Sequence, residues 1–238
     1  TAENDPLIVI DGLAMDNKGV KGLANPLSMV NPNDIESFTV LKDASATAVF
    51  GVRGANGVIL VTTKRGEEGK AQISVSTSAS LQKPIRLMEY ANSYEYALAY
   101  NEQFVNDNKD APFSEKTLEA FRTHSDPLLY PDVDWTDMIM KPVSFQSQHN
   151  LNISGGTDRV RYFTSIGILT QDGLFRTLDL GYKSNFTYNR YNYRANIDID
   201  VTKSTLLSVN LGGRLEDTNE PNYRWNLFTA LNRVTPFG

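Results

Sequence analysis

The side chains that could carry chemistry in this chain are few and widely spaced. Cysteine is absent, which excludes thiolate catalysis, disulfides and Cys-ligated zinc. The only histidines, His124 and His149, lie in different segments and lack the ligand spacing of a zinc site. Asp132 and Asp134 could ligate calcium weakly, but no complete EF-hand loop surrounds them. The sequence therefore predicts no metal site, and a solvated loop is the simpler interpretation of the aspartates.

Two further patterns are reminiscent of catalytic or cofactor sites. Asp198 and Asp200 have a spacing that could suggest paired acid–base carboxylates, yet both fall on the polar side of an alternating segment. Gly51, Gly54 and Gly57 form GxxGxxG, but a strand follows instead of the helix that a phosphate would need. No GxSxG nucleophile elbow is present. We therefore expect no catalytic residues and no cofactor, and the chain is not expected to be an enzyme.

Composition narrows the remaining classes. The chain has 238 residues, of which 40% are hydrophobic and 21% charged, as is usual for a folded protein. A net charge of −5 without a Lys/Arg run argues against nucleic-acid binding. No apolar run reaches the length of a membrane helix. There is no signal peptide at Thr1 and no natural stop at Gly238, so we expect both ends to be internal to a longer protein.

The elements that position these residues follow two different patterns. Residues 6–66 have an α/β pattern, in which Asn31 caps a short helical turn with Pro32 at its first position. Short apolar runs bounded by turn residues predict buried strands at 7–10, 38–41 and 58–63. Beyond residue 70, apolar and polar residues alternate strictly over 71–81 and 191–202, and more weakly over 148–154, 160–170 and 205–213.

Alternation is compatible with a membrane barrel or with a soluble β-sandwich. Connection lengths favour the barrel, because tight turns near 155–159 and 203–204 alternate with long connections. The longest connection, 82–147, contains two helical patterns at 92–106 and 114–124, the second capped by Ser114.

The outward side chains distinguish the two alternatives. In a barrel they meet lipid, and in a sandwich they meet a second sheet; they include Ile73, Val75, Ile197 and Ile199. The sandwich alternative is a soluble α+β glycan-binding or glycan-processing protein.

Two blocks of sequence resemble a known family. Four segments resemble, in the same order, the plug signature of SusC/RagA-type TonB-dependent transporters: PLIVIDG (6–12), NDIES (33–37), VLKDASA (40–46) and GVRGANGVILVTTK (51–64). A second block resembles the start of that family's barrel: Tyr130-Pro131 with Asp134-Trp135, His149–Leu151 with Ser154–Gly156, and Arg161–Phe163.

The resemblance implies an α+β plug domain followed by antiparallel transmembrane β-barrel strands, part of a 22-stranded barrel whose remainder is missing here. It implies that residues 1–69 are the C-terminal part of the plug. Residues 70–238 would form the first strands of the barrel, about five, with a long helical extracellular loop at about 82–147. The implied function is TonB-dependent active import of a large nutrient, a glycan, oligosaccharide or peptide, across the cell outer membrane. Implied partners are a SusD-like surface lipoprotein, outer-membrane lipid, and the TonB complex acting through a missing N-terminal segment.

The resemblance also implies contacts for particular residues. Lys42 and Arg53 are expected to pair with carboxylates of the barrel wall that lie outside this chain; local capping and solvation are the alternative. The loop 13–29 is expected to rise toward the external cavity. Its residues Asp16, Asn17 and Lys18 could touch substrate there, or belong to a polar loop without that role.

Overall fold

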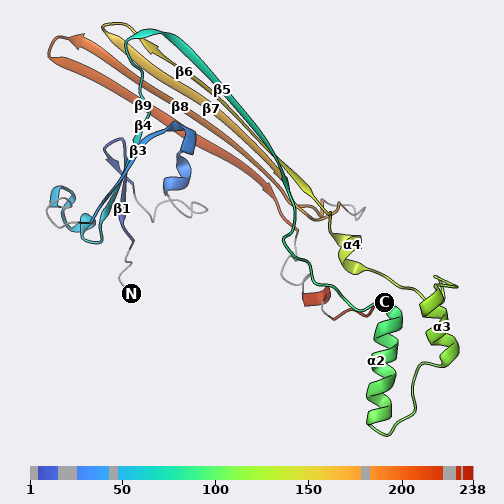
Figure 1. The fold of residues 1–238 in the computed structure, drawn as a ribbon. Coiled ribbons are helices and arrows are strands. Elements are labelled where there is room, and N and C mark those ends of the chain that lie inside the picture. Colours follow the sequence, from blue (N-terminus) through green and yellow to red (C-terminus); the bar gives the residue numbers. More distant parts are fainter. Residues whose placement is uncertain are drawn as a thin grey trace. The chain divides into compact units, whose positions relative to one another are not determined.

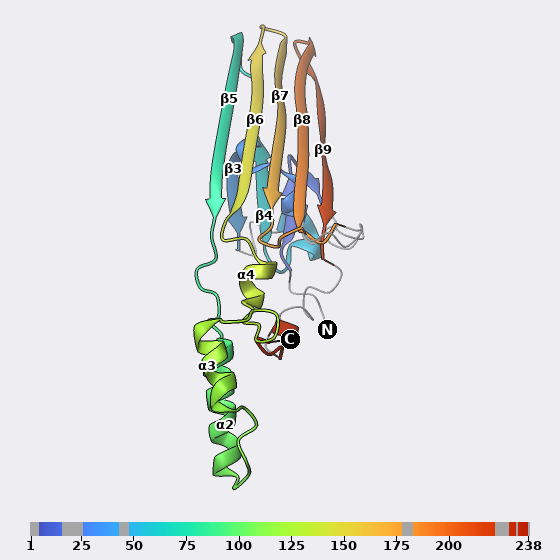
Figure 2. The same cartoon turned by 90° about the vertical axis from the view of Figure 1, so that its right-hand side faces the viewer.

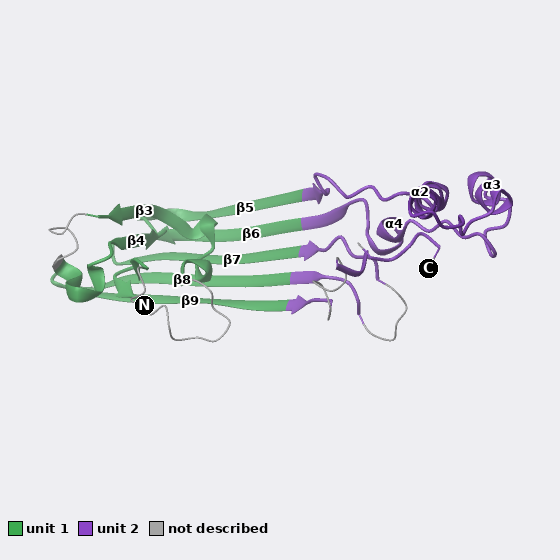
Figure 3. Cartoon of the chain, turned by 90° about the horizontal axis from the view of Figure 1, so that it is seen from below, with its two compact units in different colours: residues 1–79, 147–170, 189–217 green, residues 80–146, 171–188, 218–238 purple. Residues whose placement is uncertain are grey.

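The computed structural model describes residues 5–15, 26–42, 48–177, 183–221, 229–231 and 233–237. These residues belong to two compact units (Figure 3). Each long strand lies partly in the first unit and partly in the second. The first unit comprises residues 1–79, 147–170 and 189–217. The second comprises residues 80–146, 171–188 and 218–238. We describe each unit by itself.

The first unit contains a small mixed sheet with strand order β2-β1-β4-β3 (Figure 1). Its strands are β1 (Leu7–Ile10), β2 (Leu13–Ala14), β3 (Ile35–Leu41) and β4 (Val58–Thr63). β1 pairs with β4 in parallel, and Leu7 lies opposite Val58. Both strands read as continuous apolar runs because a parallel pair is buried on both faces. Ile8 and Val61 pack on one face, and Leu7, Val9 and Val58 pack on the other.

The predicted elements of this sheet are confirmed. β1 and β4 have the predicted bounds, and the predicted strand at 38–41 is the second half of β3. Asn31 accepts a hydrogen bond from the Asn33 backbone and precedes the 3-10 turn η2 (Pro32–Asp34), as the Asn-Pro pair predicts. Two further 3-10 segments are η1 (Pro26–Met29) and η3 (Ala48–Gly54).

The second sheet has five strands in sequence order, β5-β6-β7-β8-β9. Successive strands run in opposite directions and lie side by side (Figure 2). Their bounds are β5 (Gly69–Gln82), β6 (Ser144–Gly156), β7 (Val160–Asp172), β8 (Thr187–Thr202) and β9 (Thr205–Asn219). Each contains the segment in which alternation predicted a strand.

The two faces of the second sheet differ in polarity and in cover. On β8, Asn192, Asn196 and Asp198 are buried on the face that meets the small sheet. On the edge strand β5, Ile73 and Val75 are 69% and 70% exposed. No second sheet covers these apolar side chains within the described part of the chain, so the structure favours barrel strands over a β-sandwich.

The second unit contains the helices α2 (Ser93–Asn106), α3 (Glu115–Thr123) and α4 (Trp135–Ile139). The two helical patterns seen in the sequence are confirmed, including the cap from Ser114. Aromatic rings of α2 and α3 converge on Phe237, which stacks on Phe121 with ring centroids 5.5 Å apart. Every helix in the described residues is too short or too polar to span a bilayer.

Candidate functional site

The small sheet meets the polar face of the second sheet through a buried polar network within the first unit. We call the small sheet with its connections the plug sheet, and strands β5–β9 the wall. The network joins plug residues at the end of β1, in β4 and around η1 and η2 to wall residues from β6, β7, β8 and β9. Because these contacts connect parts of the chain separated by more than a hundred residues, they determine how the plug sheet sits against the wall.

A single arginine of the wall links two acidic residues of the plug sheet. The Arg194 side chain, 9% exposed, places one terminal nitrogen 3.4 Å from Asp11 Oδ2 and its Nε 3.7 Å from Asp34 Oδ2. Asp11 follows β1 in the tight Asp-Gly turn, and Asp34 ends η2. Two carboxylates and one guanidinium leave an excess of negative charge in a place with little water. The three side chains are therefore strongly dependent on one another.

A chain of hydrogen bonds runs beside this arginine. The Asn196 side chain, which is fully buried, donates to Thr63 Oγ1 at 2.7 Å and to the Lys64 carbonyl oxygen at 2.8 Å. The Thr63 hydroxyl in turn donates to Asp11 Oδ2 at 2.7 Å, and the Thr63 backbone N–H donates to Asp11 Oδ1 at 2.8 Å. Asp11 thus accepts bonds from its own sheet while it faces the arginine of the wall.

The carboxylates Asp198 and Asp200, considered above as an acid–base pair, are both occupied by ion pairs. Asp198 Oδ1 lies 2.7 Å from an Arg65 nitrogen of the plug sheet and accepts from Ser208 Oγ at 2.6 Å. Asp200 lies 2.9 Å from Arg161 of the neighbouring strand β7. The Arg65–Asp198 pair joins the plug sheet to the wall, and the Arg161–Asp200 pair joins two strands within the wall. This geometry supports the expectation that the pair lines a polar wall.

Close backbone approach is the second component of the interface. Asn31, the residue that caps η2, also donates to Asn150 Oδ1 of the wall at 2.9 Å. Gly167 leaves room for this bond, since an added Cβ would overlap the Asn31 amide. A Cβ on Gly66 would overlap the backbone of Tyr162. Glycine is therefore needed at both positions for the plug sheet to approach the wall this closely.

Burial perturbs Asp34, the titratable residue at the end of η2. Loss of hydration raises the pKa of the Asp34 carboxyl above its ordinary value of 3.8. A hydrogen bond with the Ser165 side chain and the positive charges of Arg194 and Lys64 act in the opposite direction and offset part of this shift in pKa. The docked plug sheet therefore binds a proton at Asp34 more readily than an undocked, hydrated one does.

The arrangement can hold two surfaces together and still allow them to separate. Hydrogen bonds and ion pairs link the two sides of the interface, so the polar groups of both sides can be rehydrated once they part. An apolar interface of the same size would expose apolar surface to water on separation, which is unfavourable in free energy. The network has no nucleophile paired with a base, and its carboxylates are engaged by arginine, threonine or serine, so the geometry supports reversible docking better than catalysis.

The residues predicted as contacts have mixed positions. Lys42 directly follows β3, is exposed, and makes no ion pair with the described residues. Arg53 lies in η3 and donates to the Met15 carbonyl oxygen at 3.3 Å. Neither observation tests contacts to carboxylates outside this chain, so that assignment stays a prediction. Asp16, Asn17 and Lys18 lie outside the described residues.

Of the residues that join plug sheet and wall, Asp198 and Asn31 were named from sequence, whereas the others were not singled out, although a signal existed. Asn192, Arg194, Asn196 and Asp198 stand on the polar side of the alternating segment 191–202. A guanidinium in such a row needs a counter-charge if anything covers it. The sequence does not identify that counter-charge, because Asp11 and Asp34 lie more than 150 residues earlier.

Replacing Arg194 with methionine tests the central ion pairs. The Arg194→Met variant leaves two buried carboxylates without their cation, and we expect docking of the plug to weaken by about 3–5 kcal/mol. The measurement is thermal unfolding and protease resistance of the plug in the full-length protein. The matched control is Arg159→Met, an exposed arginine in the turn between β6 and β7. Equal behaviour of the two variants would contradict this role for Arg194.

The raised pKa of Asp34 predicts a direction for the pH dependence of stability. Above the raised pKa the buried carboxylate is charged and destabilises the docked state; as pH falls through the raised pKa toward 3.8, protonation relieves that cost. The variant Asp34→Asn cannot titrate. Wild type should therefore gain stability relative to Asp34→Asn between pH 7 and about pH 4, measured by thermal unfolding. A gain in the opposite direction would refute the assignment.

Comparison with known proteins agrees with this architecture. A family model described as TonB-dependent Receptor Plug Domain matches residues 1–58. The TonB-dependent receptor SusC of Bacteroides thetaiotaomicron is 42% identical over 177 residues, which cover 74% of this chain and 16% of the receptor. A TonB-dependent receptor of Formosa agariphila is 33% identical over 205 residues, which cover 85% of this chain and 18% of the receptor.

Solved structures show the same fold. The RagAB peptide importer in its closed-closed state superposes with a TM-score of 0.69 at 24% identity, over 93% of this chain and 25% of that chain. The chain spans less than a fifth of the length of the curated relatives described above, which are TonB-dependent receptors. The chain has a plug sheet docked on antiparallel strands, and its relatives are TonB-dependent receptors. The chain therefore belongs to the SusC/RagA-type TonB-dependent transporters.

Proposed function

We propose that this protein imports a large nutrient, a glycan, oligosaccharide or peptide, across the cell outer membrane by TonB-dependent active transport. The observation that carries the proposal is the polar docking of a plug sheet on the inner face of antiparallel strands. In this mechanism the plug occludes a pore at rest, and a pull from the periplasm rearranges it. During that rearrangement, contacts such as Arg194–Asp11 and Asn196–Thr63 are exchanged for contacts with water. This exchange keeps the free-energy cost of the rearrangement low enough for a mechanical pull to supply.

The wall strands supply the membrane part of the proposal. They are 13 to 16 residues long, more than the roughly 9–11 residues that cross a bilayer as a tilted strand. Their outward side chains, such as Ile73 and Val75, are apolar, and lipid is the medium that suits them. The edges β5 and β9 would carry unpaired backbone groups in lipid, so further strands of the complete protein close the barrel.

The proposal assigns a role to each part of the chain. Residues 1–69 form the C-terminal part of the plug, and residues 70–238 form barrel strands with an extracellular helical loop at about 82–147. A SusD-like surface lipoprotein covers the outer opening, and the TonB complex acts on a segment that precedes the plug. Support for these partners comes from the similarity to SusC and to the RagAB fold. Asp16, Asn17 and Lys18 are proposed to face the cargo from the plug loop.

We further propose that Lys42 and Arg53 bind carboxylates of the remaining barrel wall. Replacing both with glutamine should loosen the plug, because two charge pairs across a polar wall are lost. The measurement is the sensitivity of cells to a large antibiotic that the outer membrane normally excludes. The matched control is Lys83→Gln with Arg86→Gln, two exposed residues between β5 and α2. Unchanged exclusion together with unchanged protease resistance of the plug would count against the assignment.

Import itself is tested on the native protein in its own cells. We expect it in the outer-membrane fraction, migrating faster on an SDS gel before boiling than after, as a closed barrel does. Uptake of labelled oligosaccharide or peptide pools should fall to background when either this protein or TonB is removed. A soluble protein of 26.5 kDa without a heat shift would refute the proposal.

A further inference from the structure

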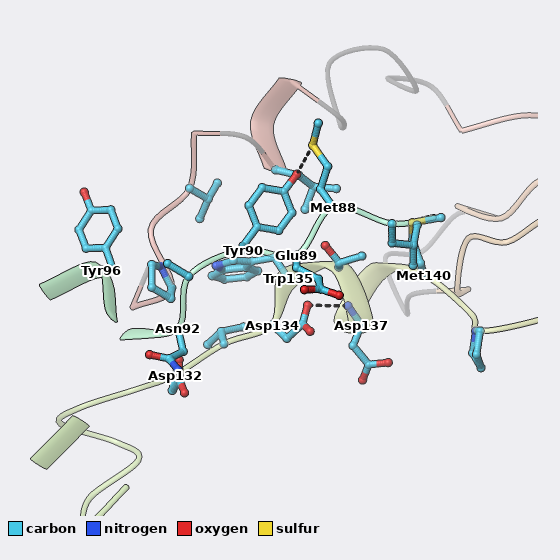
Figure 4. A pocket seen from close by; sticks show the side chains of 18 of the residues that line it. Met88, Glu89, Tyr90, Asn92, Tyr96, Asp132, Asp134, Trp135, Asp137 and Met140 are labelled. Atoms are coloured by element: carbon cyan, nitrogen blue, oxygen red, sulfur yellow. Dashed lines mark hydrogen bonds between the residues drawn. The ribbon is translucent and has the colours of Figure 1, made fainter. Parts of the chain in front are cut away.

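The second unit encloses a pocket of about 660 Å³ that the docking network does not use (Figure 4). Three stretches of chain form its walls: residues 87–92 with Tyr96, residues 132–137 with 140–142, and Leu231 with Val234 and Pro236. Its volume is typical of sites that bury a small ligand or a few residues of a peptide. All three stretches belong to the second unit, so the pocket is described within that unit alone.

Hydrogen bonds between the second and third of these stretches give this part of the pocket a fixed shape. The Trp135 indole N–H donates to the Thr235 carbonyl oxygen at 2.9 Å, and the Val133 backbone N–H donates to the Pro236 carbonyl oxygen at 2.8 Å. Asp134 caps α4 by accepting from the Asp137 backbone N–H at 2.9 Å. The aromatic lining residue Trp135 therefore stands on a braced scaffold, which lowers the ordering cost of binding.

The charge of the lining is strongly negative. Four carboxylates line the pocket, from Glu89, Asp132, Asp134 and Asp137, against the one ammonium of Lys141. Two of these charged groups already form ion pairs with residues that do not line the pocket: Asp137 lies 3.3 Å from Arg176, and Lys141 lies 3.6 Å from Asp172.

Asp132 accepts from the Ser93 backbone N–H at 2.8 Å and lies 3.7 Å from the His124 ring, which leaves two carboxylates without a charged partner among the described residues. Asp134 accepts a hydrogen bond from a neutral backbone N–H. Glu89 has no ion-pair partner among the described residues. Both line the same cavity as the faces of Tyr90 and Trp135.

Aromatic faces beside uncompensated carboxylates define the chemistry of the ligand. An ammonium or guanidinium group is attracted both by the aromatic ring and by the carboxylates. Glu89 and Asp134 are exposed, so water hydrates them when no cation is bound, and a cationic ligand gains charge pairs that a neutral ligand does not.

We propose that this pocket binds the lysine or arginine side chain of a peptide. This proposal rests on the proposed function, because it identifies basic peptides as a cargo that the transporter selects at this site. A volume of about 660 Å³ accommodates one long basic side chain together with its flanking backbone. Trp135 and Tyr90 contact the aliphatic stem and the cationic head, and Glu89 and Asp134 neutralise the charge.

The test measures binding of fluorescein-labelled trilysine, with blocked ends, to the purified full-length transporter by fluorescence polarisation. The double variant Glu89→Gln/Asp134→Asn removes two charges and keeps the helix cap, because asparagine caps as well as aspartate. We expect affinity to fall about tenfold at low salt, and the difference to shrink as salt screens the pairs. Labelled triarginine should behave as trilysine does.

The matched control removes the same charges elsewhere in the second unit. Glu102 and Asp110 are exposed and do not line the pocket, so Glu102→Gln/Asp110→Asn should bind trilysine as wild type does. Retention of the heat shift on gels shows that the barrel is intact in both double variants. The single variant Glu89→Gln, at an exposed position, should lower affinity about threefold to fivefold and provides the test if the double variant does not fold.

The outcomes separate the pocket from the import mechanism, because binding needs neither TonB nor an energised membrane. Equal trilysine affinity of the Glu89/Asp134 variant and wild type would overturn the proposal. So would binding of neutral maltotriose in place of trilysine, which would make the pocket a carbohydrate site. A transporter that passes the uptake test but does not bind trilysine overturns the pocket proposal alone; charge-dependent trilysine binding by a protein that fails the uptake test overturns import alone.

Discussion

The burial of Arg194 between Asp11 and Asp34 is the constraint on which the rest of the first unit depends. A guanidinium with so little exposure to water needs its carboxylates, and the carboxylates need it. β8 must therefore keep its register, since a slip of one residue would turn Arg194 and Asn196 to the apolar face and bring their neighbours inward. The plug sheet must also present both aspartates at one side, which the turn after β1 and the end of η2 achieve.

The polar character of this contact is what makes a plug possible. A core of apolar residues, such as Val58 and Val61, holds the plug sheet together internally. Between the plug sheet and the wall, by contrast, hydrogen bonds such as Asn196 to Thr63 predominate. Water can replace hydrogen bonds at modest net cost, whereas it cannot replace apolar packing. The plug sheet therefore has an apolar interior and a polar docking surface.

The second unit applies a different principle to its long connection. Caps at Asn92 and Ser114 begin two helices, and the ring of Phe237 joins the aromatic cluster between them. A surface loop built on such a cluster is a defined shape on a rigid scaffold, the setting in which binding sites commonly occur. The acidic aromatic pocket lies between this connection and the residues Leu231, Val234 and Pro236.

The sequence by itself determined the features that depend on near neighbours. Period-two alternation defined the wall strands, and continuous apolar runs defined β1 and β4, because side-chain direction follows directly from strand geometry. The pair Asn31-Pro32 and the cap Ser114 located helical turns because capping acts within one turn. Only the tertiary structure decided that Arg194 meets Asp11, that Gly167 makes room for Asn31, and that Trp135 reaches Thr235. These pairs are separated by about 100 to 180 residues, and no local rule of spacing records which charge or carbonyl will lie opposite once the chain has folded.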